Sequence, residues 1–446
     1  LFFYHPAVWW IGSRARCERE NAADDLALSV CTDRRAYAGA LARVAELQLL
    51  PQMALAATGG DLLARIRRIV TPVPETSVAG GWGLGMPALL TLLVAGAVFS
   101  VQAQDEKVIT VAPGQSIQAA IDAAPAGAIV RLAEGEYRER LVISKPLTLE
   151  GAGWEKTRIV IEEPVPDEIG KAYTELQVRQ KAATTPGEKE AVTTEMVQRL
   201  AQPAVWVRNA QDVKLQKLRV QGLSQRGRDD GGTSSTLVYF QRAKATMTDC
   251  AVVGPFGQGI HIADGSDVEV SHSLVAALWG EGITVHGRGR DGKLTPSRLH
   301  LADSEIRNIY HYGVAIGGGC DSTVVERCRI SGTAWHGIRY DDASPTITGN
   351  SLFQHARFGI YASGKTRATV RGNLFWKNEM EGMVCWFDSQ DLIEGNTFVA
   401  NVRGGLAVSG GGKPNVIRNI FVSNPIAVNC TQTSCKNIMK QKKRNT

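Results

Sequence analysis

Four segments repeat one pattern at intervals of 23 residues: ITGNSLFQH (347–355), VRGNLFWKN (370–378), IEGNTFVAN (393–401) and VIRNIFVSN (416–424). Each begins with a branched aliphatic residue and carries Asn at its fourth position, Leu or Phe at its sixth, and His or Asn at its ninth. A period near 23 is too short for a helical-hairpin repeat and matches one coil of a β-solenoid. One coil cannot bury its own apolar face, so coils stack and equivalent residues form columns.

The Asn column of this repeat, Asn350, Asn373, Asn396 and Asn419, has two physical reasons. Asn tolerates the left-handed backbone conformation that a corner requires. Stacked side-chain amides also satisfy one another's hydrogen bonds. We therefore expect these residues to sit at left-handed corners and to form an amide ladder.

The pattern continues upstream with looser spacing. Cys250 and Cys328 fall on the Asn column, and we expect them to be small inward-facing core residues. A second strand of each coil opens with Gly and an apolar residue, and this pair recurs seven times from Gly259 to Leu406. The sequence thus predicts an all-β solenoid of about nine or more coils over residues 107–430, followed by a tail over 431–446.

The first coils carry a different pattern. Residues 116–124 (SIQAAIDAA) predict an amphipathic helix that caps the end of the stack, where an uncovered sheet edge would be exposed. Residues 162–203 are polar and rich in Glu, Lys, Gln and Thr. We expect them to form a helical or partly mobile excursion from one corner and not a separate domain.

The N-terminal region has a composition typical of membrane association. Residues 1–50 begin with an aromatic run and continue with helical spacing, and residues 51–82 are a linker with a basic patch. Residues 83–101, GLGMPALLTLLVAGAVFSV, carry no charge and are long enough to span a bilayer. Because arginines precede this segment and acidic residues follow it, we expect a transmembrane helix with the β-helix outside the cytoplasm, in the periplasm or at the cell surface. Cleavage after Ala103 is an alternative.

Composition excludes one class of partner. The chain has 446 residues and a net charge of +6, and no basic stripe with interleaved aromatic residues is present. A nucleic-acid partner is therefore not expected. The 46 glycines and 17 prolines suit a turn-rich β protein.

Residues 111–153, VAPGQSIQAAIDAAPAGAIVRLAEGEYRERLVISKPLTLEGAG, resemble the start of pectin-lyase-like right-handed β-helix proteins. That group includes pectin esterases, pectate lyases and NosD-like surface proteins. The resemblance implies a right-handed parallel β-helix over residues 107–430. It does not specify an activity, because the aspartate motifs of the pectin esterases and galacturonan hydrolases do not appear in this sequence.

Residues 4–30, YHPAVWWIGSRARCERENAADDLALSV, resemble the end of the membrane metallopeptidase domain of β-lactam-sensing signal transducers. In that family a Glu-x-x-x-Asp helix supplies the third zinc ligand and a supporting carboxylate, and the matching residues are Glu20 and Asp24. The HExxH helix that supplies both histidine ligands is absent, so the resemblance implies zinc only in a longer protein of which this chain, starting at Leu1, is a fragment. A pair of surface charges is the alternative.

Chemistry-bearing side chains gather beside the Gly-apolar column. Residues on neighbouring coils lie about 4.8 Å apart and can act together. Aromatic rings stack on sugars, and Arg binds carboxylates through two hydrogen bonds. The outward-facing set of such residues is His311, Tyr312, Trp335, His336, Arg339, Asp341, Tyr361, Glu381 and Trp386.

Three functions fit this set. We favour a membrane-anchored sensor-transducer fragment whose β-helix binds a cell-wall or environmental polysaccharide through Tyr312, Trp335, Glu381 and Trp386. The alternative is a lyase or hydrolase acting on acidic glycans, with catalytic residues His336, Arg339, Asp341 and Tyr361. In a lyase, Arg339 would neutralise the carboxylate and His336 or Tyr361 would remove the α-proton. The third is a structural β-helix used for protein contacts, in which the His-Arg-Asp cluster is a solvated salt-bridge network.

Two insertions, 225–235 and 287–297, share a Gly-Arg-Asp core. Asp229, Asp230 and Asp291 are the candidate calcium ligands in these insertions. Neither insertion has the ligand number of a dedicated site, so polar turns are the favoured interpretation.

Overall fold

The structure is a computed structural model that describes residues 107–162, 166–223, 235–287 and 294–430. Glu20, Asp24, the segment 83–101, the three candidate calcium ligands and the tail 431–446 lie outside these residues, so the corresponding predictions stay predictions. Within the described ranges, no helix combines the length and the apolar character that a bilayer span requires.

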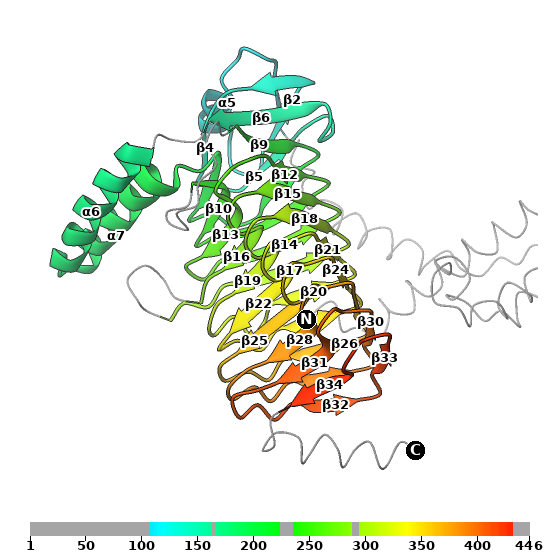
Figure 1. Cartoon of the computed structure of the whole chain (residues 1–446). Coiled ribbons are helices and arrows are strands. Elements are labelled where there is room, and N and C mark those ends of the chain that lie inside the picture. Colours follow the sequence, from blue (N-terminus) through cyan, green and yellow to red (C-terminus); the bar gives the residue numbers. More distant parts are fainter. Residues whose placement is uncertain (1–106, 163–165, 224–234, 288–293, 431–446) are drawn as a thin grey trace, which may run out of the picture. The chain divides into compact units, whose positions relative to one another are not determined.

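Each coil contributes one strand to each of three parallel sheets, here called A, B and C, and the coils stack along one axis (Figure 1). Sheet A has twelve described strands: β1 (Val108–Val111), β2 (Ile129–Leu132), β5 (Leu147–Glu150), β8 (Val213–Gln216), β11 (Lys244–Thr248), β14 (Asp267–Ser271), β17 (Arg298–Ala302), β20 (Val324–Glu326), β23 (Thr346–Thr348), β26 (Thr369–Arg371), β29 (Leu392–Glu394) and β32 (Asn415–Ile417).

Sheets B and C have eleven described strands each. Sheet B contains β3 (Gly135–Tyr137), β6 (Thr157–Glu162), β9 (Arg219–Leu223), β12 (Ala251–Val253), β15 (Leu274–Leu278), β18 (Glu305–Ile309), β21 (Arg329–Ser331), β24 (Ser351–Phe353), β27 (Leu374–Trp376), β30 (Thr397–Val399) and β33 (Ile420–Val422). Sheet C contains β4 (Leu141–Ile143), β7 (Val205–Arg208), β10 (Thr236–Gln241), β13 (Gln258–Ala263), β16 (Ile283–Val285), β19 (Val314–Ile316), β22 (Ile338–Asp341), β25 (Ile360–Ser363), β28 (Glu381–Cys385), β31 (Gly404–Val408) and β34 (Val428–Cys430).

The predicted parallel β-helix is confirmed, with about eleven coils. Its core consists of the inward columns. Phe375 stacks on Phe398 with ring centroids 4.6 Å apart, and Phe398 stacks on Phe421 at 5.0 Å. Cys250 and Cys328 are buried, as expected from their place in the Asn column.

The Asn ladder is confirmed at the turn from sheet A to sheet B. The Nδ2 atoms of Asn350, Asn373 and Asn396 each donate to the Oδ1 atom of the next Asn at 3.0 Å. Each of these oxygens also accepts the backbone N–H of the Asn one coil earlier, at 2.8–2.9 Å. The four coils from Asn350 to Asn419 are therefore tied one to the next by two hydrogen bonds that one side-chain oxygen accepts.

The expectation that these Asn residues adopt the left-handed conformation is wrong. The positive φ angles belong to the preceding residues: Gly349 (66°), Gly372 (63°), Gly395 (63°) and Arg418 (51°). Because the chain turns one residue earlier, each Asn side chain points into the stack and its amide reaches the next coil.

A second amide ladder lies at the end of sheet B. Asn378 Nδ2 donates to Asn401 Oδ1 at 2.8 Å, and Asn401 Nδ2 donates to Asn424 Oδ1 at 2.9 Å. His355 occupies the first place of this ladder and is fully buried. Its Nδ1 atom accepts a hydrogen bond from the Thr333 hydroxyl at 2.7 Å.

The Gly-apolar column has a steric cause. A Cβ atom on Gly337 would lie 2.5 Å from His355 Nε2 and 2.7 Å from the carbonyl oxygen of Gly359. A Cβ atom on Gly359 would lie 2.5 Å from the carbonyl oxygen of Gly382. Adjacent coils approach too closely here for any side chain, so the column marks the turn from sheet B into sheet C, called here the B–C turn.

Helices cover two parts of the β-helix. The predicted capping helix is α5 (Ile117–Ala123), whose first turn is capped by the Ser116 side chain and whose Ile117 and Ile121 are buried in the core. The excursion between β6 and β7 contains α6 (Pro166–Ala182), α7 (Pro186–Met196) and a π-helix, η2 (Val197–Ala201). Val197 and Ala201 of η2 pack on Trp206 and Tyr239, so the outer face of sheet C is closed at this end.

The amide ladder can be tested with Asn373→Ala. This change leaves the backbone N–H and the side-chain amide of Asn350 without their acceptor and the Ile347 carbonyl without its donor. A buried polar group without a partner costs about 1–3 kcal/mol, so we expect the free energy of unfolding in urea to fall by about 2–5 kcal/mol. Arg367→Ala, at an exposed position, is the control and should change it by less than about 0.5 kcal/mol. A loss below about 1 kcal/mol for Asn373→Ala would contradict this role of the ladder.

Candidate functional site

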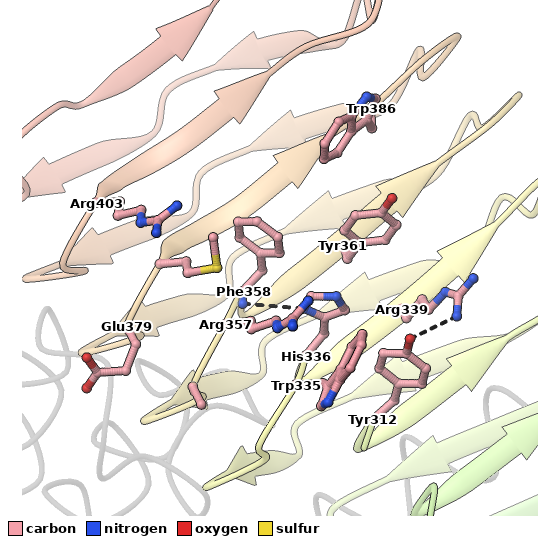
Figure 2. A pocket seen from close by; sticks show the side chains of 12 residues that line it. Tyr312, Trp335, His336, Arg339, Arg357, Phe358, Tyr361, Glu379, Trp386 and Arg403 are labelled. Carbon is pink, nitrogen blue, oxygen red and sulfur yellow. Dashed lines mark hydrogen bonds between the residues drawn. The ribbon is translucent and has the colours of Figure 1, made fainter. Parts of the chain in front are cut away.

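A pocket of about 730 Å³ opens on the B–C turns and the outer face of sheet C. Backbone hydrogen bonds between successive coils align the residues of its wall, as from Arg357 N to Trp335 O at 3.1 Å and from Met380 N to Arg357 O at 3.3 Å. Twelve residues line the pocket (Figure 2): Tyr312, Trp335, His336, Arg339, Ala356, Arg357, Phe358, Tyr361, Glu379, Met380, Trp386 and Arg403. Its volume lies within the usual range for small-ligand sites.

Aromatic rings from consecutive coils form a column along one side of the pocket. The His336 imidazole lies between Tyr312 and Tyr361, with ring centroids 5.4 Å and 4.9 Å away and nearly parallel planes (Figure 2). Trp386 continues the column 6.1 Å beyond Tyr361. Trp386 keeps 37% of its surface exposed, so its ring remains open to a ligand.

His336 is held as a neutral ring within this column. Only 4% of its surface is exposed, and burial, followed by the nearby charges of Arg357 and Arg339, lowers the pKa of His336 to about 3. Its Nδ1 atom accepts the Phe358 N–H at 3.4 Å. This hydrogen bond assigns the remaining proton to Nε2, so the ring presents a donor to the pocket and not a free basic nitrogen.

Three arginines bring positive charge to the pocket. Arg339 donates to Asp341 Oδ2 at 2.5 Å and to the Tyr312 hydroxyl at 3.0 Å. Arg357 lies 3.8 Å above the Trp335 ring in a cation–π contact. Neither Arg357 nor Arg403 forms an ion pair with a described carboxylate, and Glu379 is the one acidic residue among the lining residues. The pocket therefore attracts anions.

The structure brings together most of the site residues predicted from the sequence. Tyr312, Trp335, His336, Arg339, Tyr361 and Trp386 line the pocket, and Asp341 pairs with Arg339. Three predicted residues, Asp341, Glu381 and His311, are not among the lining residues. Glu381 is 9% exposed and opens β28, whereas His311 faces Glu281, with Nδ1 and Oε1 3.6 Å apart.

Sequence reasoning missed Arg357, Glu379 and Arg403. Arg357 stands two residues before Gly359, and Arg403 two residues before Gly405, which is the offset of Trp335 from Gly337. The same column rule that selected Trp335 would have found both arginines. Glu379 stands three residues before Gly382, one position earlier than the other two stand before their glycines. The column rule does not select that position, so the structure was needed to show that Glu379 lines the pocket.

The described residues offer no metal centre at this pocket, because none of them form a cluster of three or more His, Cys, Asp or Glu side chains in a suitable arrangement.

A comparison with sequence families agrees with the fold. The sequence family described as "Right handed beta helix region" matches residues 293–443, and the described coils form a right-handed parallel β-helix. The A-module of a mannuronan C-5 epimerase from Azotobacter vinelandii is 16% identical, with a TM-score of 0.42 over 71% of this chain and 94% of that one. A pectate lyase, Pel9A, is 13% identical, with a TM-score of 0.45 over 70% of this chain and 78% of that one. The Dettilon tailspike protein is 14% identical, with a TM-score of 0.45 over 74% of this chain and 70% of that one. No curated protein sequence matches the chain.

Acid stability tests the buried histidines. Burial lowers the pKa of both His336 and His355 to about 3, whereas an unfolded histidine titrates near 6.5. Between these values the unfolded chain binds more protons, so this stability is complete above about pH 6.5 and is lost as the pH falls. Each histidine contributes about 1.4 kcal/mol per pH unit in that window.

His355→Asn would extend the amide ladder and remove one of the two titrating groups. We expect the loss of unfolding free energy between pH 6 and pH 4 to be smaller in this variant than in the natural protein by about 2 kcal/mol. Gln354→Asn is the control, because it changes an exposed side chain of the same coil and removes no titrating group. Equal pH slopes for His355→Asn and the natural protein would contradict the buried, neutral state of His355.

Proposed function

We propose that the pocket on the B–C turns binds an acidic polysaccharide. The observation that carries this proposal is the convergence of three arginines with the Tyr312, Tyr361 and Trp386 rings around a cavity that holds one lining carboxylate. Aromatic faces stack on the apolar faces of sugar rings, and guanidinium groups pair with sugar carboxylates. Together these groups fit a polymer of sugars that carries negative charge.

The arginines of the pocket differ in the partners that they already contact. Arg339 is oriented by Asp341 and Tyr312, which fix its guanidinium beside the aromatic column. Arg357 lies over the Trp335 ring, and its guanidinium makes no hydrogen bond to a described side chain, so its donors are available to a ligand. A carboxylate that enters between Arg357 and Arg403 would replace water around two cations that no described carboxylate neutralises, which favours binding of an anion over a neutral sugar.

The geometry of His336 favours binding over lyase catalysis. A general base works best with a pKa near the operating pH and with a free nitrogen within reach of the proton. His336 meets neither condition, because its pKa is about 3 and its Nδ1 atom already accepts the Phe358 N–H. The Tyr361 phenol, in register with Arg339 on the adjacent strand, is the remaining candidate base for a lyase reaction.

The proposal also keeps the predicted cellular setting. Residues 83–101 would anchor the chain in a membrane, and the β-helix would meet its glycan outside the cytoplasm. The metallopeptidase resemblance around Glu20 and Asp24 would make the whole protein a transducer that senses this glycan.

Loss of one cation or one ring should weaken the binding of a tetragalacturonate probe measured by calorimetry. A hydrogen bond to a charged group contributes about 1.5–3 kcal/mol, so Arg339→Ala and Arg357→Ala should each raise Kd by about 10- to 100-fold. Trp386→Ala should raise it by roughly tenfold through the lost stacking. Arg367→Ala removes the same charge away from the pocket and should leave Kd within about twofold.

Unchanged affinity in all three pocket variants, or an equal loss in Arg367→Ala, would reject this pocket as the glycan site. An increase in ultraviolet absorbance from unsaturated sugars during incubation with acidic polysaccharides would favour the lyase alternative, and Tyr361→Phe should then abolish that signal.

A further inference from the structure

A second groove of about 660 Å³ lies against the first, on the sheet B side of the same turns. Two lining residues, Ala356 and Glu379, belong to both cavities. Trp335 and Arg357, one position further along the turn, line the first pocket and not the second. Because the two cavities share lining residues, a chain that leaves the first pocket at Ala356 and Glu379 would enter the second groove directly.

Aromatic side chains form one end of this groove. Trp279 and Tyr310 are 37% and 38% exposed, and their ring centroids lie 5.9 Å apart. Both occupy the first position of the B–C turn, in consecutive coils, since Tyr310 N donates to Leu278 O at 2.9 Å. Burial in a core does not explain either ring, because more than a third of each faces solvent.

Small residues form the floor beyond these rings. Backbone hydrogen bonds place Ala334, Ala356 and Glu379 at the same turn position in the next three coils. At about 4.8 Å per coil, Tyr310 and Glu379 are about 14 Å apart along the stack, with only two methyl groups between them. A flat ring can therefore lie on the alanines with one edge against Tyr310.

The second groove differs from the first in charge. Its described lining contains no arginine or lysine, and Glu379 carries its one carboxylate. Exposed side-chain amides of Asn308 and Gln354 face it, and neither amide is hydrogen-bonded to a described residue. Amides and aromatic rings without a cation suit an uncharged, hydroxyl- or acetamido-bearing sugar, whereas an acidic sugar would be repelled by Glu379.

Resting on the proposed glycan binding, we infer that this second groove is a subsite for an uncharged sugar residue of the same chain. The natural ligand is then a heteropolysaccharide in which acidic and uncharged sugars alternate: the acidic residue occupies the arginine pocket, and the uncharged residue lies on Ala334 and Ala356 against Trp279 and Tyr310.

Calorimetry with two kinds of tetrasaccharide separates the subsites. One probe is tetragalacturonate, which is acidic throughout. The other is a panel in which a uronate alternates with N-acetylglucosamine, N-acetylgalactosamine or a neutral hexose. The natural protein should bind at least one alternating probe about tenfold or more tighter than tetragalacturonate, a difference of about 1.4 kcal/mol that the aromatic contacts with Trp279 and Tyr310 would supply.

Trp279→Ala and Tyr310→Ala should each remove most of that preference and leave the Kd of tetragalacturonate within about twofold. Trp279→Phe and Tyr310→Phe keep an aromatic face and should retain the preference, which separates stacking from a folding defect. Circular dichroism should show the same β content in all four variants.

Three results would overturn the second subsite: no alternating probe preferred by the natural protein, alanine variants that keep the preference, or alanine variants that weaken both probe types equally. These differ from failure of the first pocket. If Arg339→Ala and Arg357→Ala weaken tetragalacturonate while Trp279→Ala and Tyr310→Ala change nothing, the arginine pocket stands and only the second subsite falls. If no probe binds the natural protein, the proposed function fails, and the second subsite fails with it.

Discussion

The hydrogen bonds that tie each coil to the next determine every other feature of this β-helix. Parallel pairing satisfies the backbone of the three sheets, but the corners between sheets leave polar groups inside the stack. The amide ladders from Asn350 to Asn419 and from Asn378 to Asn424 satisfy those groups with side chains. A buried amide is costly without its partner, so the ladders hold coils in a single register.

That register also builds the candidate site. Tyr312 and His336 are 24 residues apart along the chain, yet their rings stack because they occupy equivalent turn positions in adjacent coils. Tyr361 stacks on the other face of His336 from strand β25, where it is in register with Arg339. Glycine at positions 337 and 359 lets adjacent coils approach closely beside these rings. Stacking and burial then decide the protonation of His336, which stays neutral beside two arginines. The pocket presents fixed cations and rings, a suitable arrangement for binding a charged polymer.

The two grooves on the B–C turns differ in the charge of their side chains. On the sheet C side, arginines and aromatic rings surround a pocket for an anion, whereas the sheet B side carries rings, methyl groups and amides without a cation. At the other end of the β-helix, η2 closes the outer face of sheet C over Trp206 and Tyr239. Both grooves lie in coils beyond the helical excursion, so η2 does not cover the site of the proposed glycan binding.

The sequence by itself determined the solenoid, its inward columns and most of the site. The 23-residue period and the alternation of inward and outward residues are local consequences of stacking, so Trp335, Arg339, Tyr361 and Trp386 were identified by counting along the coils. Only the tertiary structure decided which turn residues face the pocket. The left-handed corner falls on Gly349 and not on Asn350, Glu381 is buried while Glu379 is exposed, and His336 is covered by two rings. These outcomes depend on the direction of each side chain at a corner. Contacts between coils set that direction, and the period of the sequence does not specify those contacts.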